Sequence, residues 1–213
     1  GHADPLKSVE GFQKAAERLG VNFRINTTAI RIDTYVASGC RRFNAIETNS
    51  GSIVAGNAML AAGVQTNLLL RGLGIHIPMI TPLVSAFQTV PVGTSLGPVI
   101  GVANGDLAVR QQIDGRLRFT GGAEQINANL DLSGEYPAVY PPAASISQVI
   151  SSVSSVLPLI LRTPICRIWG GLLDLTPDAL PILDCVPSID GLYIAAGFSG
   201  HGFGIAPAVG EVM

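Results

Sequence analysis

The residues with the clearest chemical potential lie near the carboxyl end of the chain. An apolar run at residues 191–196 precedes a glycine-rich stretch, which leads into a sequence with helical character. A strand that reaches a helix through glycines directs free backbone N–H groups and the positive end of the helix at one point. The pattern predicts an anion or cofactor cradle, with these candidate residues: Gly197, Gly200, His201, Gly202, Phe203 and Gly204. The same glycines would also suit a tight turn without a ligand, and we expect only a positioning role for His201.

Residues 191–212 resemble, over some twenty consecutive positions, the carboxyl-terminal flavin-binding signature of the D-amino-acid oxidase superfamily. The similarity is to its branch of glycine oxidases, sarcosine oxidases and opine or hydroxyproline dehydrogenases. Residues 167–171 and 176–183 resemble the family's Trp-Gly and Thr-Pro-Asp-Gly-x-Pro segments, with Ala179 in place of the usual glycine. The resemblance implies non-covalent FAD, since residues 172–175 contain no cysteine for a covalent link, and it adds Gly170 to the cofactor contacts.

The rest of the chain also follows the family order. Residues 57–63 resemble the apolar-Ala-Ala-Gly strand beside the adenosine half of FAD, which adds Ala62 and Gly63 to the cofactor contacts. The implied fold is α/β (mixed α+β), a partial FAD-binding Rossmann-like domain with an inserted antiparallel-sheet substrate domain. We expect residues 1–73 and 166–213 to belong to the FAD-binding domain and residues 74–165 to form the substrate domain.

Hydrophobic periodicity predicts the individual elements. We expect helices at residues 5–19 and 145–161 and from residue 205, and strands at residues 21–25, in a meander over residues 29–54, and at 191–196. The apolar run at residues 57–63 suits a strand buried on both faces. Asp114-Gly115 predicts the turn of a hairpin.

Two departures from the family affect the predicted chemistry. None of the 25 glycines forms the Gly-x-Gly-x-x-Gly fingerprint that holds the FAD diphosphate, so the chain alone should bind FAD weakly or not at all, and both of its ends look cut. The family's carboxylate anchors are also missing, because residues 172–175 contain no arginine and Gly204 occupies the position of the lysine of sarcosine oxidases. Arg110, Arg118 and Arg167 are the remaining candidates for binding a substrate carboxylate, although arginines on a sheet surface often have only a structural role.

Composition excludes several other classes of protein. The net charge is −2 and no basic cluster exceeds two residues, which argues against nucleic acid and anionic membranes as partners. The apolar runs are too short to span a bilayer, and we predict no metal site. Three distant cysteines, Cys40, Cys166 and Cys185, indicate neither a disulfide framework nor a zinc site, and they favour a reducing compartment and a cytoplasmic location. We expect Cys166 and Cys185 to be buried, inert thiols. Charged residues make up only 13% of the chain, which suggests a surface that another segment or subunit covers.

The function implied by the resemblance is flavin-dependent oxidation of a small-molecule amine or amino acid. Hydride passes from the substrate Cα to FAD, and the resulting imine is hydrolysed. The pattern of anchors is most similar to dehydrogenase subunits within complexes, including hydrogen cyanide synthase, so other subunits are expected partners. The electron acceptor stays open. A truncated or split lobe without catalytic activity is the alternative, and a transfer-RNA-modifying flavoprotein is disfavoured because basic surface and cysteine chemistry are lacking.

Overall fold

The chain folds into two compact units. The computed structural model describes residues 3–93, 96–102, 107–125 and 139–213. Unit 1 contains the described residues of Gly1–Met79 and Thr176–Met213, and unit 2 those of Ile80–Asp131 and Tyr136–Leu175. The mixed α/β architecture confirms the predicted fold class.

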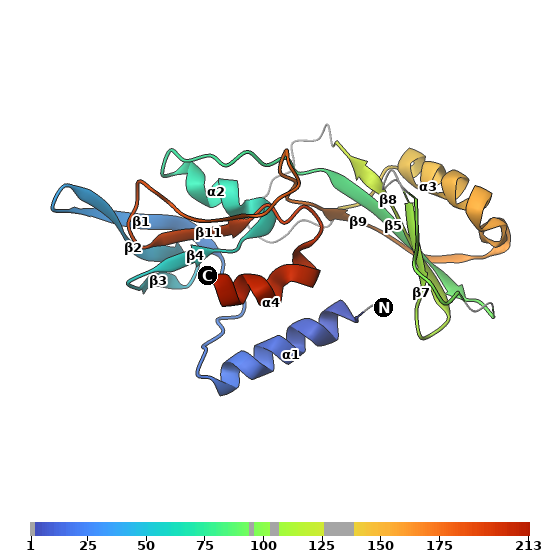
Figure 1. Cartoon of the computed structure of the whole chain (residues 1–213), viewed down its shortest axis with the longest axis horizontal. Helices are drawn as coiled ribbons and strands as arrows, with labels where there is room; N and C mark the ends of the chain where they lie inside the picture. The colour runs from blue at the N-terminus through green and yellow to red at the C-terminus, as the bar shows by residue number, and fades with distance from the viewer. Residues whose placement is uncertain (1–2, 94–95, 103–106, 126–138) are drawn as a thin grey trace. The chain divides into compact units, whose positions relative to one another are not determined.

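Unit 1 contains two small sheets (Figure 1). One is the antiparallel meander β1-β2-β3, as predicted, and the other has the order β10-β11-β4, with β11 parallel to β4. Its elements are α1 (Pro5–Arg18), β1 (Ala29–Ala37), β2 (Cys40–Thr48), β3 (Gly51–Val54), β4 (Ala58–Leu60), the 3-10 helix η1 (Gly63–Gln65), α2 (Thr66–Arg71), β10 (Ile182–Cys185), β11 (Leu192–Ala196) and α4 (Gly202–Val212). Apolar side chains from both sheets and from α2 form a common core that includes Ile32, Phe43, Leu60, Leu70, Leu192 and Ile194.

Helix α1 begins where the sequence predicts. The Asp4 side chain accepts a hydrogen bond from the backbone N–H of Lys7, and Pro5 occupies the first turn, where its missing N–H costs nothing. No residue of α1 is buried, and the side chains of Leu6 and Phe12 on its apolar stripe are 68% and 63% exposed. Nothing in the described part of unit 1 therefore covers this stripe.

Two sequence expectations in unit 1 are wrong. Residues 21–25 form no strand: residues 21–24 have no regular secondary structure, a turn begins at Ile25, and Ile25 is 69% exposed. Without a neighbouring strand to pair with, β-propensity alone does not make a strand. The run at residues 57–63 is not buried on both faces either, because Met59 in β4 is 46% exposed while Leu60 lies in the core.

Unit 2 is built on a five-stranded antiparallel sheet with the order β6-β7-β8-β5-β9. Its elements are β5 (Leu83–Pro91), β6 (Ile100–Gly101), β7 (Leu107–Gln111), β8 (Arg116–Glu124), α3 (Ala143–Val156), the 3-10 helix η2 (Pro158–Arg162) and β9 (Ile165–Leu172). The hairpin β7-β8 turns at Gly115, whose φ of +84° favours glycine, as Asp114-Gly115 predicts. Strand β9 pairs with β5 along its length, and this pairing places it in unit 2, whereas the predicted boundary at residue 165 assigned it to the FAD-binding domain.

Helix α3 covers one face of this sheet (Figure 1). Phe87 of β5 and Phe119 of β8 are fully buried under it and stack with ring centroids 4.7 Å apart. A Cβ on Gly121 would lie 2.6 Å from Cγ2 of Val149, so glycine allows the helix to approach. Because strand side chains alternate, residues next to the two phenylalanines in sequence point to the opposite face.

Candidate functional site

Two parallel strands of unit 1 end at the same edge of their sheet. β4 and β11 are paired in register, with Ala58 opposite Leu192 and Leu60 opposite Ile194. Both strands then lead to glycine and to a helix: β4 through Ala62 and Gly63, and β11 through the glycine turn, residues 197–204, into α4. Ligands of α/β folds bind outside the carboxyl ends of parallel strands. The structure thus brings the two predicted groups of cofactor contacts together at one sheet edge.

The conformation of the glycine turn explains several of its residues. Gly197, Ser199 and Gly200 have φ values of +72°, +51° and +82°, in the left-handed region that glycine adopts without strain. A Cβ on Gly197 would lie 2.5 Å from Cγ2 of Thr176, so this position has no room for a side chain. The backbone N–H of His201 donates to the carbonyl of Phe198 at 2.8 Å and closes the turn.

A hydroxyl pair fixes the turn to the segment that begins at Thr176. The backbone N–H of Thr176 donates to Oγ of the buried Ser199 at 3.2 Å, and the two side-chain oxygens are 3.0 Å apart. The Thr176 hydroxyl also lies 2.8 Å from the carbonyl of Leu180. Because a hydroxyl has a single proton, Thr176 donates to Leu180 and Ser199 donates to Thr176 or to the carbonyl of Gly197, 3.1 Å away.

Other glycines of this edge face open space. Apart from chain neighbours and the backbone of the same helix, no atom of the described residues lies within 4 Å of the position that a Cβ would take on Gly63 or on Gly204. The first backbone N–H groups of α4, including those of Gly202 and Phe203, have no partner within the helix. His201 stands at the N-cap of α4, and its side chain forms no capping bond. Open space beside N–H donors suits the close approach of an anionic or polar ring edge.

Gly170 belongs to β9 of unit 2, whereas the other predicted cofactor contacts belong to unit 1. A Cβ there would lie 2.6 Å from Cδ1 of Leu83 and 2.9 Å from the carbonyl oxygen of Val139. Close packing therefore already requires glycine at this position. Its contact with a cofactor stays a prediction.

The predicted substrate-binding arginines lie in one transverse row of the sheet of unit 2. Arg110 of β7 is opposite Arg118 of β8, Arg118 is opposite Gln88 of β5, and Gln88 is opposite Arg167 of β9. Directly opposed residues project from the same face. This face is the one that α3 does not cover, and we call these four residues the arginine row. The sequence alone did not identify Gln88, because strand register is not visible without the partner strands.

Trp169 lies within this cluster. The guanidinium carbons of Arg118 and Arg167 are 4.9 Å and 5.2 Å from the centroid of its ring, within the range of cation–π interactions. Burial lowers the pKa of Arg118, and the positive charges of Arg110 and Arg167 lower it further. None of the ion pairs among the described residues involves a residue of the row. The row is therefore a concentration of positive charge without an acidic partner in the part of the chain that is described.

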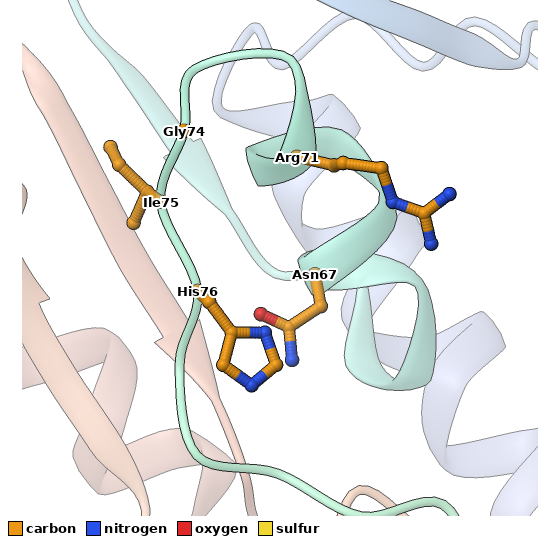
Figure 2. A pocket seen from close by; sticks show the side chains of 5 residues that line it. All are labelled: Asn67, Arg71, Gly74, Ile75 and His76. Carbon is orange, nitrogen blue, oxygen red and sulfur yellow. The ribbon is translucent and has the colours of Figure 1, made fainter.

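A pocket of about 320 Å³ lies at the end of α2 (Figure 2). It is lined by Asn67, Arg71, Gly74, Ile75 and His76. The amide of Asn67 donates to the carbonyl of Ile77 and accepts from its N–H, both at 2.9 Å, so it is occupied in holding the loop. The side chains of Arg71 and His76 do not point toward one another in Figure 2. We assign no ligand to this pocket.

The described residues contain no cluster of side chains suited to a metal ion. All three cysteines are free and exposed, which corrects the expectation of buried thiols at Cys166 and Cys185. The Cys166 thiol lies 3.1 Å from the carbonyl oxygen of Thr89, within hydrogen-bond distance.

Among the helices that the structure describes, none combines the length and apolar character that a membrane crossing requires. The cytoplasmic location stays a prediction.

Comparison with known proteins gives one consistent result. The family of FAD dependent oxidoreductases (DAO) matches the chain over residues 1–213. The sarcosine oxidase beta subunits of Rhizobium meliloti and Rhodobacter capsulatus are each 26% identical over 204 residues. Those matches cover 94% and 95% of this chain but 45% and 46% of the two relatives. The chain thus spans about half the length of the curated relatives it matches.

Solved structures agree with this assignment. The L-proline dehydrogenase of P. horikoshii superposes with a TM-score of 0.81 and 25% identity, covering 98% of this chain and 54% of that protein. The glycine oxidase of Geobacillus kaustophilus gives a TM-score of 0.75 at 20% identity, covering 92% of this chain and 49% of that protein, and this match supports the fold alone. The shared architecture therefore extends over both units of the chain.

Proposed function

The chain belongs to the family of FAD dependent oxidoreductases, and from this premise we propose that it is part of a flavoenzyme that oxidises an amine or amino acid. The supporting observation is the shared edge of β4 and β11, where glycines, open space and the first turn of α4 meet. The relatives are named as oxidases of sarcosine and glycine and as a dehydrogenase of proline. Amine oxidation by this chain is a proposal that agrees with those names.

The sheet edge in unit 1 fits part of a flavin. Gly63 and Gly204 leave room for close approach, and the N–H groups of Gly202 and Phe203 are donors for a polar ring edge. With these we propose that Ala62, Gly197, Gly200 and His201 contact the cofactor non-covalently. The sequence contains no Gly-x-Gly-x-x-Gly, the motif that binds the FAD diphosphate in this kind of fold.

When bound, FAD would accept the hydride in such a reaction. The chain's own residues would orient the substrate and stabilise the charge that develops on the ring. The N–H donors at the start of α4 would stabilise negative charge on a reduced ring. In unit 2, we propose Arg110 and Arg167 as alternative partners for the carboxylate of the substrate, which either could bind through charge-assisted hydrogen bonds. Fixing the carboxylate would hold the Cα–H in one orientation, which is the main advantage that binding gives to such a reaction.

The proposal treats the chain as one part of the active enzyme, because it spans about half of its curated relatives. Further subunits are also proposed partners, since these relatives are named as beta subunits. A non-catalytic lobe is the second candidate. The observation that favours it is the missing fingerprint.

Titration with FAD separates the two candidates. The absorbance spectrum and dissociation constant are measured for the chain alone and for the chain mixed with a separately expressed amino-terminal Gly-x-Gly-x-x-Gly segment from the family. The expected result is tight flavin binding only in the mixture. Reduction of that flavin by an added amine or amino acid would then support the proposed oxidation. Tight binding by the chain alone would show that the fingerprint is not needed here. No binding in either sample would favour the non-catalytic lobe.

A further inference from the structure

The arginine row carries more positive charge than one carboxylate can neutralise. Three guanidinium groups project from one face of the sheet, and Gln88 adds an uncharged amide between two of them. One carboxylate has two oxygens and accepts a bidentate pair of hydrogen bonds from one arginine. A single substrate carboxylate would leave most of the charge of the row without a partner.

A purely structural role does not explain such a row. Elsewhere this chain places arginines beside aspartates, as in Arg42 with Asp190 at 3.2 Å and Arg116 with Asp114 at 3.3 Å. In the row, Arg110 lies directly opposite Arg118, an arrangement that destabilises a sheet when both charges have the same sign. The unfavourable environment of Arg118 is also seen in its lowered pKa. An arrangement that costs stability in the free protein is typical of a binding site.

The arginine row is also wide enough for two acidic groups of one small molecule to reach different arginines. Adjacent strands are about 4.8 Å apart, so Arg110 and Arg167, separated by three strand spacings, have backbones on the order of 14 Å apart. The guanidinium carbons of Arg118 and Arg167 lie no more than about 10 Å apart, since they are 4.9 Å and 5.2 Å from the same ring centroid of Trp169. Two acidic groups of one small molecule can therefore reach different arginines, with its apolar atoms against the indole.

We propose that the arginine row binds an amine substrate with two carboxylates, that is, a dicarboxylic amino acid or an amino acid whose nitrogen carries a second carboxyalkyl group. This inference rests on the proposed function, and it narrows the substrate class. Arg118 and Arg167 bind one carboxylate over Trp169, and Arg110 binds the other. Gln88 donates a hydrogen bond to Oε1 of Gln112.

Trp169 gives a direct measurement, because it is the single tryptophan of the chain. The full chain is titrated with glutarate and with valerate, which have the same number of carbons but two carboxylates and one. Ionic strength is held constant with sodium chloride, since screening alone alters exposed charges. We expect glutarate to change the fluorescence of Trp169 with a midpoint about tenfold lower than that of valerate, the ratio that about 1.4 kcal/mol gives.

Two variants of the row and one matched control complete the test. Arg110→Gln should reduce the preference for glutarate to less than about threefold, because it removes the partner of the second carboxylate, whereas Arg118→Gln should weaken the binding of both acids. Arg162→Gln removes an exposed arginine of the same unit, outside the row, and should leave the preference unchanged. Thermal melting of each variant shows whether it is folded.

The outcomes distinguish this inference from the proposed function on which it rests. A preference for glutarate that disappears in Arg110→Gln and persists in Arg162→Gln supports two carboxylates. Equal binding of both acids, lost in the row variants, overturns the dicarboxylate inference and leaves a carboxylate site. No fluorescence change with either acid beyond that with chloride overturns both the inference and the proposed role of the row.

Discussion

Ser199 and Thr176 form a buried hydroxyl pair, with their side-chain oxygens 3.0 Å apart, although 23 residues separate them in sequence. Ser199 also accepts from the backbone N–H of Thr176 and lies in the glycine turn with a φ of +51°. A non-glycine residue with positive φ is uncommon, and here the hydrogen bonds compensate for it. The pair therefore fixes the turn before α4 to the segment that follows β9.

The first prediction concerns this pair. Ser199→Ala keeps the backbone constraint and removes the hydroxyl, leaving the N–H of Thr176 buried without its partner. The free energy of unfolding should fall by about 1–2 kcal/mol, measured by urea denaturation monitored by circular dichroism. Ser199→Gly is the matched control, because it also removes the hydroxyl but relieves the positive φ, and it should lose less stability. If Ser199→Ala were as stable as the wild type, the pair would have no structural role.

The second prediction separates the two kinds of glycine in the turn. Gly197→Ala places a methyl group 2.5 Å from Cγ2 of Thr176 at a φ of +72°, and it should destabilise the fold by about 2–3 kcal/mol. Gly204→Ala lies in a helix with no atom within 4 Å of the new Cβ, and it should stabilise the fold by about 0.5–1 kcal/mol. Thermal melting of both variants tests this difference.

The third prediction concerns the effect of Gly204→Ala on flavin affinity. The substitution should weaken FAD binding although it stabilises the fold. If Gly204 is open because a flavin approaches it, its methyl group should weaken FAD binding by about tenfold, equal to about 1.4 kcal/mol, in the chain mixed with the amino-terminal segment. Gly210→Ala is the control, since it lies in the same helix with equally open surroundings and no proposed contact. Equal FAD affinity of Gly204→Ala and the wild type would remove Gly204 from the cofactor contacts.

Much of this fold follows from local sequence signals. Asp4-Pro5 marks the start of α1, and Asp114-Gly115 marks the hairpin, because capping and turn geometry depend on few neighbouring residues. The strand at residues 21–25 was wrongly predicted for the converse reason: strands require a partner, which local sequence does not reveal. The glycine turn could be predicted from its motif.

Side-chain arrangements that depend on strand register are harder to predict from the sequence. Arg110 and Arg167 were candidates by residue type, yet their alignment with Arg118 through Gln88 depends on three separate strand pairings. The cation–π contacts of Trp169 likewise join residues from β8 and β9 across β5. The exposure of α1 contradicts its amphipathic pattern within the described chain, because a pattern shows that a face suits burial and not what buries it.

The fourth prediction compares two phenylalanines. Phe12→Ala on α1 should change the free energy of unfolding by no more than about 0.5 kcal/mol, because its side chain is already 63% exposed. Phe87→Ala should cost about 3–5 kcal/mol, since Phe87 is fully buried and stacks on Phe119. Chemical denaturation of the two variants at one protein concentration tests the contrast. A large loss for Phe12→Ala would mean that α1 is packed in solution.

The fifth prediction concerns the electrostatic cost of the arginine row. Arg110→Gln removes the like charge opposite Arg118 and should stabilise the free chain by about 0.2–1 kcal/mol. The gain should shrink as salt rises, because the Debye length falls from about 30 Å at 0.01 M to about 3 Å at 1 M. Arg116→Gln is the control: it loses the ion pair with Asp114, so its stability should decrease slightly or stay the same.

The lowered pKa of Arg118 determines how the stabilisation by Arg110→Gln should depend on pH. A cationic group whose pKa is lower in the folded state destabilises that state at every pH below the lowered value, and the cost disappears only as the pH rises through it. Arginine stays charged at neutral pH, so the stabilisation by Arg110→Gln should be the same at about pH 6 and pH 8. Urea denaturation at the two pH values, each at low and high salt, measures it. A gain that varies with pH but not with salt would assign the effect to some group other than the arginines.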